Sequence, residues 1–293
     1  MRQSENRDTI CLEEARILSQ ISYPGDQYII RLAAPGCARR ASPGSFAHLT
    51  CDPATPMRRP LSIMRANAEE GWLEFLYKPV GRGLALLATR PVGDSVSVLG
   101  PIGRGFEPDP GRPTILAIGG GVGIPPIYYL AEQIRHQSAV EMLVLMGSEV
   151  PFPFELGRSS RVVAGIPGDV AATVANLDDW GIASRLASNA GYAGCFEGMV
   201  PDLARSWLAA LSSERLDEVQ IVGCGPVPML AALATLAKDY GLPCQVAVEE
   251  FMACGVGGCA GCTILVRTPA GPAMKRVCVD GPVFEAQDVF PLQ

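Results

Sequence analysis

Four cysteines near the C-terminal end of the chain restrict its fold more than any other feature of the sequence. They follow the spacing C-x4-C-x2-C-x15-C, and they are Cys254, Cys259, Cys262 and Cys278. The first three lie in CGVGGCAGC, where the glycines leave the backbone free to wrap around a small object and to direct amides toward it. Thiolates are the soft ligands of iron–sulfur clusters, and this spacing is typical of a 2Fe-2S cluster. We therefore expect these four cysteines to hold such a cluster.

Two other states of these cysteines remain open from the sequence alone. A four-cysteine zinc site normally joins two short Cys-x-x-Cys knuckles, and this chain has one. The four thiols could also carry no ligand. A set of disulfides is disfavoured, because the chain reads as cytoplasmic and thiols stay reduced there. The cysteines without ligand spacing are expected to be inert thiols: Cys11, Cys37, Cys51, Cys195 and Cys244.

The composition argues against several classes of protein. With 293 residues, of which 48% are hydrophobic, the chain is large enough for two packed domains. Its net charge is -6 and no run of Lys or Arg exceeds two residues, which argues against nucleic-acid binding. The N-terminus lacks the pattern of a signal peptide, and no window is apolar enough for a membrane helix. We expect a cytoplasmic protein with no membrane contact, and the charged fraction of 18% suggests that a partner covers part of its surface.

The pattern of apolar runs changes near residue 110. Before it, short β-like runs alternate with turn residues, and one short helix is expected from Gly83, which is typical of a sandwich or a barrel. After Pro113, a strand, a glycine-rich turn, a helix and another strand follow, which indicates a parallel α/β sheet. We expect further strands of this sheet in the runs RVVAGI (161–166), EVQIVG and QVAVE.

These patterns divide the chain into three predicted ranges. Residues 1–110 form a β-sandwich or β-barrel, residues 111–248 form a doubly wound parallel-sheet nucleotide domain, and residues 249–293 form a small cluster-binding region. The last range is too short for a core of its own, so it should fold around something else. Residues 151–199 are expected to be partly irregular excursions from the sheet.

Two glycine turns in the α/β range are predicted to bind a nucleotide. Gly119–Gly123 follows a strand and opens a helix, so a pyrophosphate can approach the backbone and the free N–H groups of the helix start. Gly223–Pro226 is a second turn of this kind, and both should lie at the carboxyl edge of the sheet. The fingerprint G-x-G-x-x-G is imperfect because Pro126 replaces its last glycine. A plain strand-to-helix turn is the alternative.

A third motif lies in the β-rich range. Arg59 beside Pro60 can hold a phosphate bidentately, and Ser62 can donate a hydrogen bond to a ring nitrogen. Gly81–Gly83 can present N–H groups to a pyrophosphate. Taken alone, RRPLSI reads as an edge strand with surface charges. Beside the other two motifs, a second cofactor site is favoured.

The order of these motifs resembles that of the ferredoxin-NADP reductase superfamily, in which a flavin-binding barrel precedes a nicotinamide domain. In this chain they are RPLSI, GRG, GPIGRGF, GGGVGIPP and CGP. The cysteine-rich end, with VCVDGPVF, looks like that of the electron-transfer subunits of class 1B dihydroorotate dehydrogenase. The resemblance implies FAD in the barrel, NAD(H) on the sheet domain and one 2Fe-2S cluster. It also implies a partner subunit with FMN and the dihydroorotate site in a (β/α)8 barrel.

The resemblance further implies which residues contact the cofactors. On the FAD side they are Arg59, Pro60, Leu61, Ser62, Tyr77, Gly81, Arg82 and Gly83. On the nicotinamide side they are Gly119, Gly120, Gly121, Gly123, Cys224, Gly225 and Pro226. Ser62 and Cys224 are the expected catalytic residues. His48 and His136 have no evident nucleophile to serve, so we expect them in ordinary surface or capping roles.

The expected function is an electron-transfer subunit of a hetero-oligomeric oxidoreductase in pyrimidine biosynthesis. It would move electrons between NAD(H), FAD and the cluster, to or from an FMN subunit that oxidises dihydroorotate to orotate. Related FAD and 2Fe-2S subunits also serve sulfhydrogenases and electron-bifurcating transhydrogenases, and a stand-alone NAD(P)H reductase is a further alternative. Outside the enzymes, the alternative is a zinc-stabilised nucleotide-binding regulator.

Overall fold

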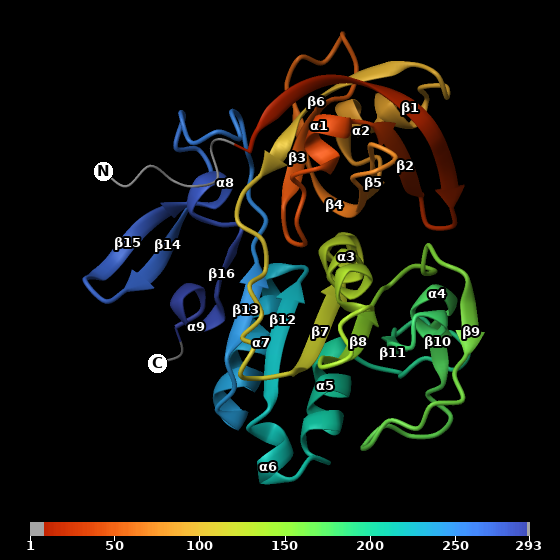
Figure 1. Ribbon diagram of the computed structural model, residues 1–293, viewed down its shortest axis with the longest axis vertical. Helices are drawn as coiled ribbons and strands as arrows, with labels where there is room; N and C mark the ends of the chain where they lie inside the picture. The colour runs from red at the N-terminus through yellow and green to blue at the C-terminus, as the bar shows by residue number, and fades with distance from the viewer. Residues whose placement is uncertain (1–8, 292–293) are drawn as a thin grey trace. The chain divides into compact units, whose positions relative to one another are not determined.

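The structure is a computed structural model that describes residues 9–291 (Figure 1). The chain divides into two compact units. Unit 1 contains the residues up to Gly105 together with Val248–Val283, and unit 2 contains Phe106–Ala247 together with the segment from Phe284 onward. The cysteine-rich segment therefore belongs to the same unit as the N-terminal strands. The three predicted ranges themselves stay a prediction about domain boundaries.

Unit 1 is built on a closed antiparallel barrel, which confirms the predicted barrel. The strand order is β1-β2-β5-β4-β3-β6. The strands are β1 (Cys11–Tyr23), β2 (Gln27–Ala33), β3 (Phe46–Thr50), β4 (Arg59–Asn67), β5 (Trp72–Tyr77) and β6 (Ser95–Ile102). Two helices connect them, α1 (Pro35–Ala38) and α2 (Gly81–Ala88). The sequence patterning missed β1, because only Ala15 and Ile17 of this strand are buried.

The cysteine-rich segment adds a small hairpin to unit 1. A loop that carries three of the four cysteines leads into β14 (Thr263–Thr268), which pairs with β15 (Gly271–Arg276). The short helix α8 (Val277–Asp280) then brings the fourth cysteine back to the loop, and Val277 N–H donates to the carbonyl of Cys262 at 2.9 Å.

Unit 2 is built on a six-stranded sheet with the order β11-β8-β7-β12-β13-β16. Its strands are β7 (Thr114–Gly120), β8 (Glu141–Gly147), β11 (Ala183–Ala187), β12 (Val219–Cys224), β13 (Cys244–Ala247) and β16 (Val283–Glu285). The pairings from β11 to β13 are parallel, as predicted. The helices are η1 (Gly121–Gly123), α3 (Ile124–Ile134), α4 (Ala175–Asp179), α5 (Val200–Leu208), α6 (Ser213–Leu216), α7 (Val227–Tyr240) and α9 (Ala286–Val289).

The predicted strand at 161–166 is wrong. This segment contains turns and no strand. None of its side chains is buried, and Val162 is 96% exposed. The edge of the sheet is taken instead by β11, which pairs with β8. The other strands of the 151–199 stretch are β9 (Leu156–Arg158) and β10 (Ala172–Val174), which form a separate antiparallel pair.

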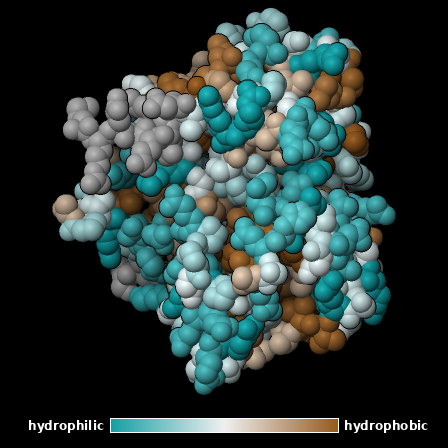
Figure 2. All heavy atoms as spheres, in the orientation of Figure 1, coloured by the Kyte–Doolittle hydropathy of each residue, from teal (hydrophilic) through white to brown (hydrophobic). Residues whose placement is uncertain are grey.

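The outer surface carries scattered apolar residues. On the face drawn in Figure 2, hydrophilic residues predominate and hydrophobic residues gather in small separate groups. None of the helices between residues 9 and 291 combines the length and the apolar character of a membrane-spanning segment.

Candidate functional site

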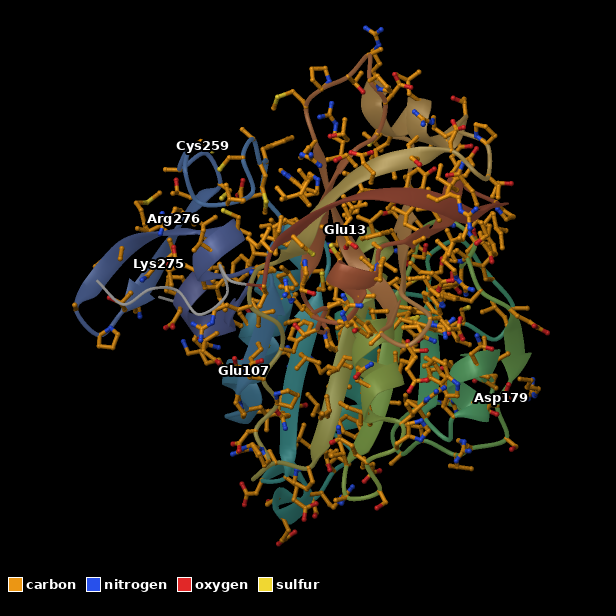
Figure 3. The ribbon with its side chains drawn as sticks, turned by 45° about the horizontal axis from the view of Figure 1, so that its top comes forward. Glu13, Glu107, Asp179, Cys259, Lys275 and Arg276 are labelled. Carbon is orange, nitrogen blue, oxygen red and sulfur yellow. The ribbon has the colours of Figure 1, made fainter. Side chains whose placement is uncertain are left out.

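The four predicted ligand cysteines lie in unit 1 as two pairs. Cys262 and Cys278 are each 3% exposed, and their sulfur atoms lie 3.3 Å apart. Cys254 and Cys259 form the outer pair, and Cys259 is exposed on the loop, as its label in Figure 3 shows. Two pairs of thiols, with three members in the loop and Cys278 on α8, match the ligand set of two iron atoms.

Backbone amides point at the sulfurs of the outer pair. The N–H of Cys259 donates to Cys254 Sγ and the N–H of Gly261 donates to Cys259 Sγ, each at 3.4 Å. Burial alone would raise the pKa of Cys254, but hydrogen bonds led by the Cys259 amide lower it to about 7. Amide donors of this kind stabilise thiolates, so the residues present fit an iron–sulfur cluster.

The inner pair is held in a drier environment. Burial and the hydrogen bond with the neighbouring Cys262 together raise the pKa of Cys278 to about 12. Coordination to a metal ion removes such thiol protons outright, so burial does not disqualify these two ligands. The Arg276 guanidinium braces the loop by donating to the carbonyl of Gly257 at 3.0 Å.

His48 is not a surface residue, which corrects the expectation from the sequence. Its side chain is 0% exposed, and neither ring nitrogen has a hydrogen-bond partner among the residues that the structure describes. An unsatisfied buried polar group costs about 1–3 kcal/mol. Burial, followed by the charges of Arg58 and Arg59, lowers the pKa of His48 to about 4. The other histidine, His136, is exposed as expected.

The predicted FAD phosphate contacts come together at the start of α2. A Cβ atom on Gly83 would lie 3.1 Å from Arg59 Nε, so the missing side chain leaves room for the guanidinium group. Backbone carbonyls of Met57 and Arg58 hold this group by accepting from Nη1 at 3.0 and 3.2 Å. The helix start has no side-chain cap, and Gly81 has open space around it. Free N–H groups beside a guanidinium group fit a pyrophosphate.

The remaining FAD-side residues occupy different environments. Ser62 lies on β4 opposite Phe46, on the strand face that alternates with the core-facing Leu61. The Tyr77 ring is 1% exposed, and its hydroxyl already donates to Gln20 Oε1 at 2.9 Å. Pro60 is half-buried and Arg82 is exposed. Their contacts with a flavin stay predictions.

The two glycine turns of unit 2 lie side by side at the carboxyl edge of the sheet, as predicted. Gly119 pairs with Cys224 between the parallel strands β7 and β12. A Cβ atom on Gly123 would lie 2.4 Å from the carbonyl oxygen of Cys224, so the turns touch backbone to backbone. Gly120 and Gly225 are packed together in the same way around Met229.

The start of α3 is shaped for an anion. No side chain caps this 11-residue helix, and the space around Gly121 is open. Pro125 and Pro126 in the first turn have no N–H to donate, so the donors here are the N–H groups of the glycine turn before the helix. With the positive helix end, these groups fit the pyrophosphate of a dinucleotide. The Cys224 side chain is buried at the end of β12, whereas Pro226 is exposed at the start of α7.

Comparison with known proteins gives one matching family model and several relatives that are similar over nearly the whole chain. A family model described as the iron-sulfur cluster binding domain of dihydroorotate dehydrogenase B matches residues 249–290. The chain is 33% identical over 278 residues to the electron transfer subunit of dihydroorotate dehydrogenase B (NAD(+)) from Caldanaerobacter subterraneus subsp. tengcongensis, covering 94% of this chain and 98% of the relative. It is 32% identical to the subunit of the same name from Geobacillus thermodenitrificans, with the same coverage.

Solved structures support the fold. An NADH-dependent reduced ferredoxin-NADP oxidoreductase has a TM-score of 0.76 at 22% identity, covering 94% of this chain and 90% of that chain. A ferredoxin NADP+ reductase from Neisseria gonorrhoeae, solved with FAD and NADP, has a TM-score of 0.58 at 18% identity, covering 78% of this chain and 92% of that chain. A barrel followed by a parallel sheet is therefore a shared architecture.

Proposed function

Since this chain belongs to the family of electron transfer subunits of dihydroorotate dehydrogenase B, we propose that it carries electrons between NAD(H) and a partner subunit that oxidises dihydroorotate to orotate. The observation that carries the proposal is the pairing of two cofactor-shaped sites within unit 1. One is the basic cradle of Arg59 and the α2 start, and the other is the four-cysteine loop. A simple nicotinamide reductase needs the first site and has no use for the second.

Each site has a distinct task in this proposal. FAD would supply the change from two-electron to one-electron transfer, because it can accept the two electrons of a hydride and release them one at a time, and a 2Fe-2S cluster would carry those single electrons. Arg59 and the amides of α2 hold the FAD pyrophosphate, and Ser62 orients the flavin by a hydrogen bond. The glycine turns of unit 2 hold the pyrophosphate of NAD(H), with Cys224 behind them. The four cysteines hold the cluster.

Exposed apolar side chains near the cluster loop favour a partner on this part of unit 1. Phe251, three residues before the first ligand cysteine, is 93% exposed. Leu265 and Met274 face each other across the β14–β15 hairpin, and each is 61% exposed. Large apolar residues left in water are favourable places for a protein interface. We propose that an FMN-containing (β/α)8-barrel subunit binds here and forms a hetero-oligomer.

The test is to measure the chain alone and with its partner. The isolated chain, purified without oxygen, should contain iron and FAD and should reduce artificial dyes with NADH without oxidising dihydroorotate. Adding the FMN subunit should create orotate formation with NAD+ as acceptor. Orotate formation by the isolated chain would contradict the proposal, and so would zinc in place of iron.

Two variants separate the sites. Cys262→Ser should abolish the coupled activity while largely sparing dye reduction, because dyes accept electrons from FAD directly. Arg59→Ala is the matched control: it should weaken FAD binding by about 1.5–3 kcal/mol, the scale for a hydrogen bond to a charged group, and leave the cluster spectrum unchanged. Loss of both activities in both variants would mean that the two sites are not independent.

A further inference from the structure

His48 is the one buried histidine among the described residues, and it lacks any hydrogen-bond partner there. The ring is 0% exposed, yet both Nδ1 and Nε2 are unsatisfied. Buried polar groups in folded proteins are almost always hydrogen-bonded. We therefore look for a hydrogen-bond partner of His48 among the groups that the functional protein binds. The question is which group supplies it.

The strand register places His48 on the face of the barrel that the flavin motif uses. His48 is paired with Pro60 and Phe46 is paired with Ser62 between β3 and β4. Residues paired across two antiparallel strands point to the same side of the sheet. The intervening Ala47 and Leu61 are buried in the barrel core. His48 therefore shares the outward face of Pro60 and Ser62.

The other neighbour of His48 is the cluster loop. A Cβ atom on Gly255 would lie 2.8 Å from His48 Nδ1 and 3.1 Å from its Cε1. The φ angle of Gly255 is +69°, which favours glycine on conformational grounds as well. The Nδ1 edge of the ring thus packs against the backbone directly beside the ligand Cys254. One side chain faces both the flavin side and the cluster side of unit 1.

The neutral imidazole ring of His48 can donate a hydrogen bond. Burial and the adjacent arginines keep the imidazole neutral, so it carries one N–H donor and one acceptor nitrogen. The sulfur atoms of an iron–sulfur cluster carry negative charge, and hydrogen bonds to them make the cluster easier to reduce. The backbone around Gly255 is close enough to Nδ1 to leave no space for a side chain between them.

We propose that His48 is a positioning residue for electron transfer, whose Nδ1–H donates a hydrogen bond to a sulfur on the Cys254 side of the cluster. This inference rests on the proposed function, because it requires the cluster to be bound. The hydrogen bond holds the cluster loop against the flavin-binding face of the barrel. It also stabilises the reduced cluster, and so shifts the electron equilibrium between flavin and cluster toward the cluster.

The test compares two variants that differ in the donor alone. In His48→Asn the side-chain amide nitrogen takes the position of Nδ1, whereas His48→Leu keeps a similar branched shape without a donor. The complete chain with iron and FAD is titrated anaerobically, and the reduced cluster is followed by electron paramagnetic resonance. We expect His48→Leu to shift the equilibrium about tenfold away from the cluster, which is 59 mV for a one-electron couple. His48→Asn should stay close to the wild type.

A second measurement leaves His48 unchanged. The chain contains two histidines, so labelling with 15N-histidine and removing the other by His136→Gln leaves His48 as the single reporter. Pulsed electron paramagnetic resonance of the reduced cluster should then detect a weak coupling to the labelled nitrogen. Absence of this coupling in a fully iron-loaded protein overturns the inference.

The remaining outcomes are equally decisive. Equal cluster potentials in the wild type and both variants would mean that His48 only fills space. Equal shifts in both variants would mean that packing, and not the donor, sets the potential. A wild-type chain without iron would overturn the proposed function and this inference with it, whereas the results above overturn the inference alone.

Discussion

Two pairs of cysteine sulfurs in unit 1 have the same separation, but the groups to which they belong differ in their hydrogen bonds. The Sγ atoms of Cys262 and Cys278 lie 3.3 Å apart in the cluster loop, and those of Cys11 and Cys37 lie 3.3 Å apart between β1 and α1. The latter pair lies beside Glu13, which is labelled in Figure 3. On distances alone the second group is the tighter candidate for a metal ion, because the ligand atoms of Cys11, Glu13 and Cys37 all lie within 4.8 Å of one another. The hydrogen bonds around the sulfurs separate them.

The inner pair of the loop resembles the Cys11–Cys37 pair, since Cys262 donates its thiol proton to Cys278 Sγ and burial raises the pKa of Cys278. The difference lies in the outer pair of the loop, Cys254 and Cys259. In the cluster loop, backbone N–H groups donate to the sulfurs of Cys254 and Cys259. In the other group the sulfurs are donors, because both thiols donate to the carbonyl of Gly100, Cys11 at 3.1 Å and Cys37 at 2.9 Å. Burial raises the pKa of Cys37 well above its ordinary value, and the hydrogen bond with Glu13 raises it further.

This difference shows that a short distance between two sulfur atoms is not enough to make a metal site. Amide donors stabilise the thiolate that a cluster needs, whereas a carbonyl and a carboxylate stabilise the protonated thiol. The Glu13 carboxylate is itself occupied, accepting from the N–H groups of Gly36 at 2.9 Å and Cys37 at 2.7 Å. We propose that the Cys11–Cys37 group is a closed structural contact and that the cysteine-rich loop holds the cluster.

The largest expected effect is on iron content. Cys259→Ser should reduce the iron from about two atoms per chain to nearly none and remove the visible cluster absorbance, because one of four ligands is lost. FAD content should be retained. The matched variant Cys37→Ser should keep its iron, since its sulfur is not a ligand. Iron analysis of both proteins checks the comparison, which breaks if Cys37→Ser loses iron as well.

The next effect is on thiol reactivity after removal of the metal. In the iron-free chain, Cys254 should be alkylated by iodoacetamide with a midpoint near pH 7, because the thiolate is the reactive form. Cys37 should react at least about tenfold more slowly at pH 7, because its thiol stays protonated and buried. Peptide mass spectrometry measures each rate. The holoprotein is the control, and in it Cys254 should be protected. Similar rates for the two thiols would remove the distinction drawn from the hydrogen bonds.

These contrasts also show what sequence could predict. The four loop cysteines and the glycine turns could be singled out because their signals are local spacings, and their roles as cluster ligands and nucleotide contacts stay predictions. The contact between Cys11 and Cys37 depends on how β1 meets α1, and no spacing between residues 26 positions apart reports it. The burial of His48 depends on the register of β3 with β4 and on a loop more than 200 residues away. RVVAGI was misassigned because its environment also depends on tertiary contacts. An apolar run forms a strand only where it can pair with a neighbouring strand, and here β11 pairs with β8 instead.

The smallest expected effect is on the local stability of α1 and tests the role of Glu13. Burial alone would raise the pKa of Glu13, but the hydrogen bonds from Gly36 and Cys37 outweigh burial and hold the pKa below its ordinary value. A carboxylate with a lowered pKa contributes stability that is complete above the unfolded-state pKa of about 4.3 and is lost as the pH falls through the folded-state value. The contribution should therefore be constant between pH 5 and pH 8.

Glu13→Gln replaces one acceptor oxygen with a donor group, so one of the two amides loses its partner. We expect a local destabilisation of about 1 kcal/mol, which corresponds to roughly fivefold faster hydrogen exchange at Gly36 and Cys37. Exchange measured on peptides that cover α1, in variant and wild type at the same pH, cancels the intrinsic pH dependence of exchange. Because the contact is closed and holds no metal, iron content should be unchanged in the variant. Exchange at α1 that depends on added zinc in the wild type, and not in Glu13→Gln, would instead make this group a second metal site.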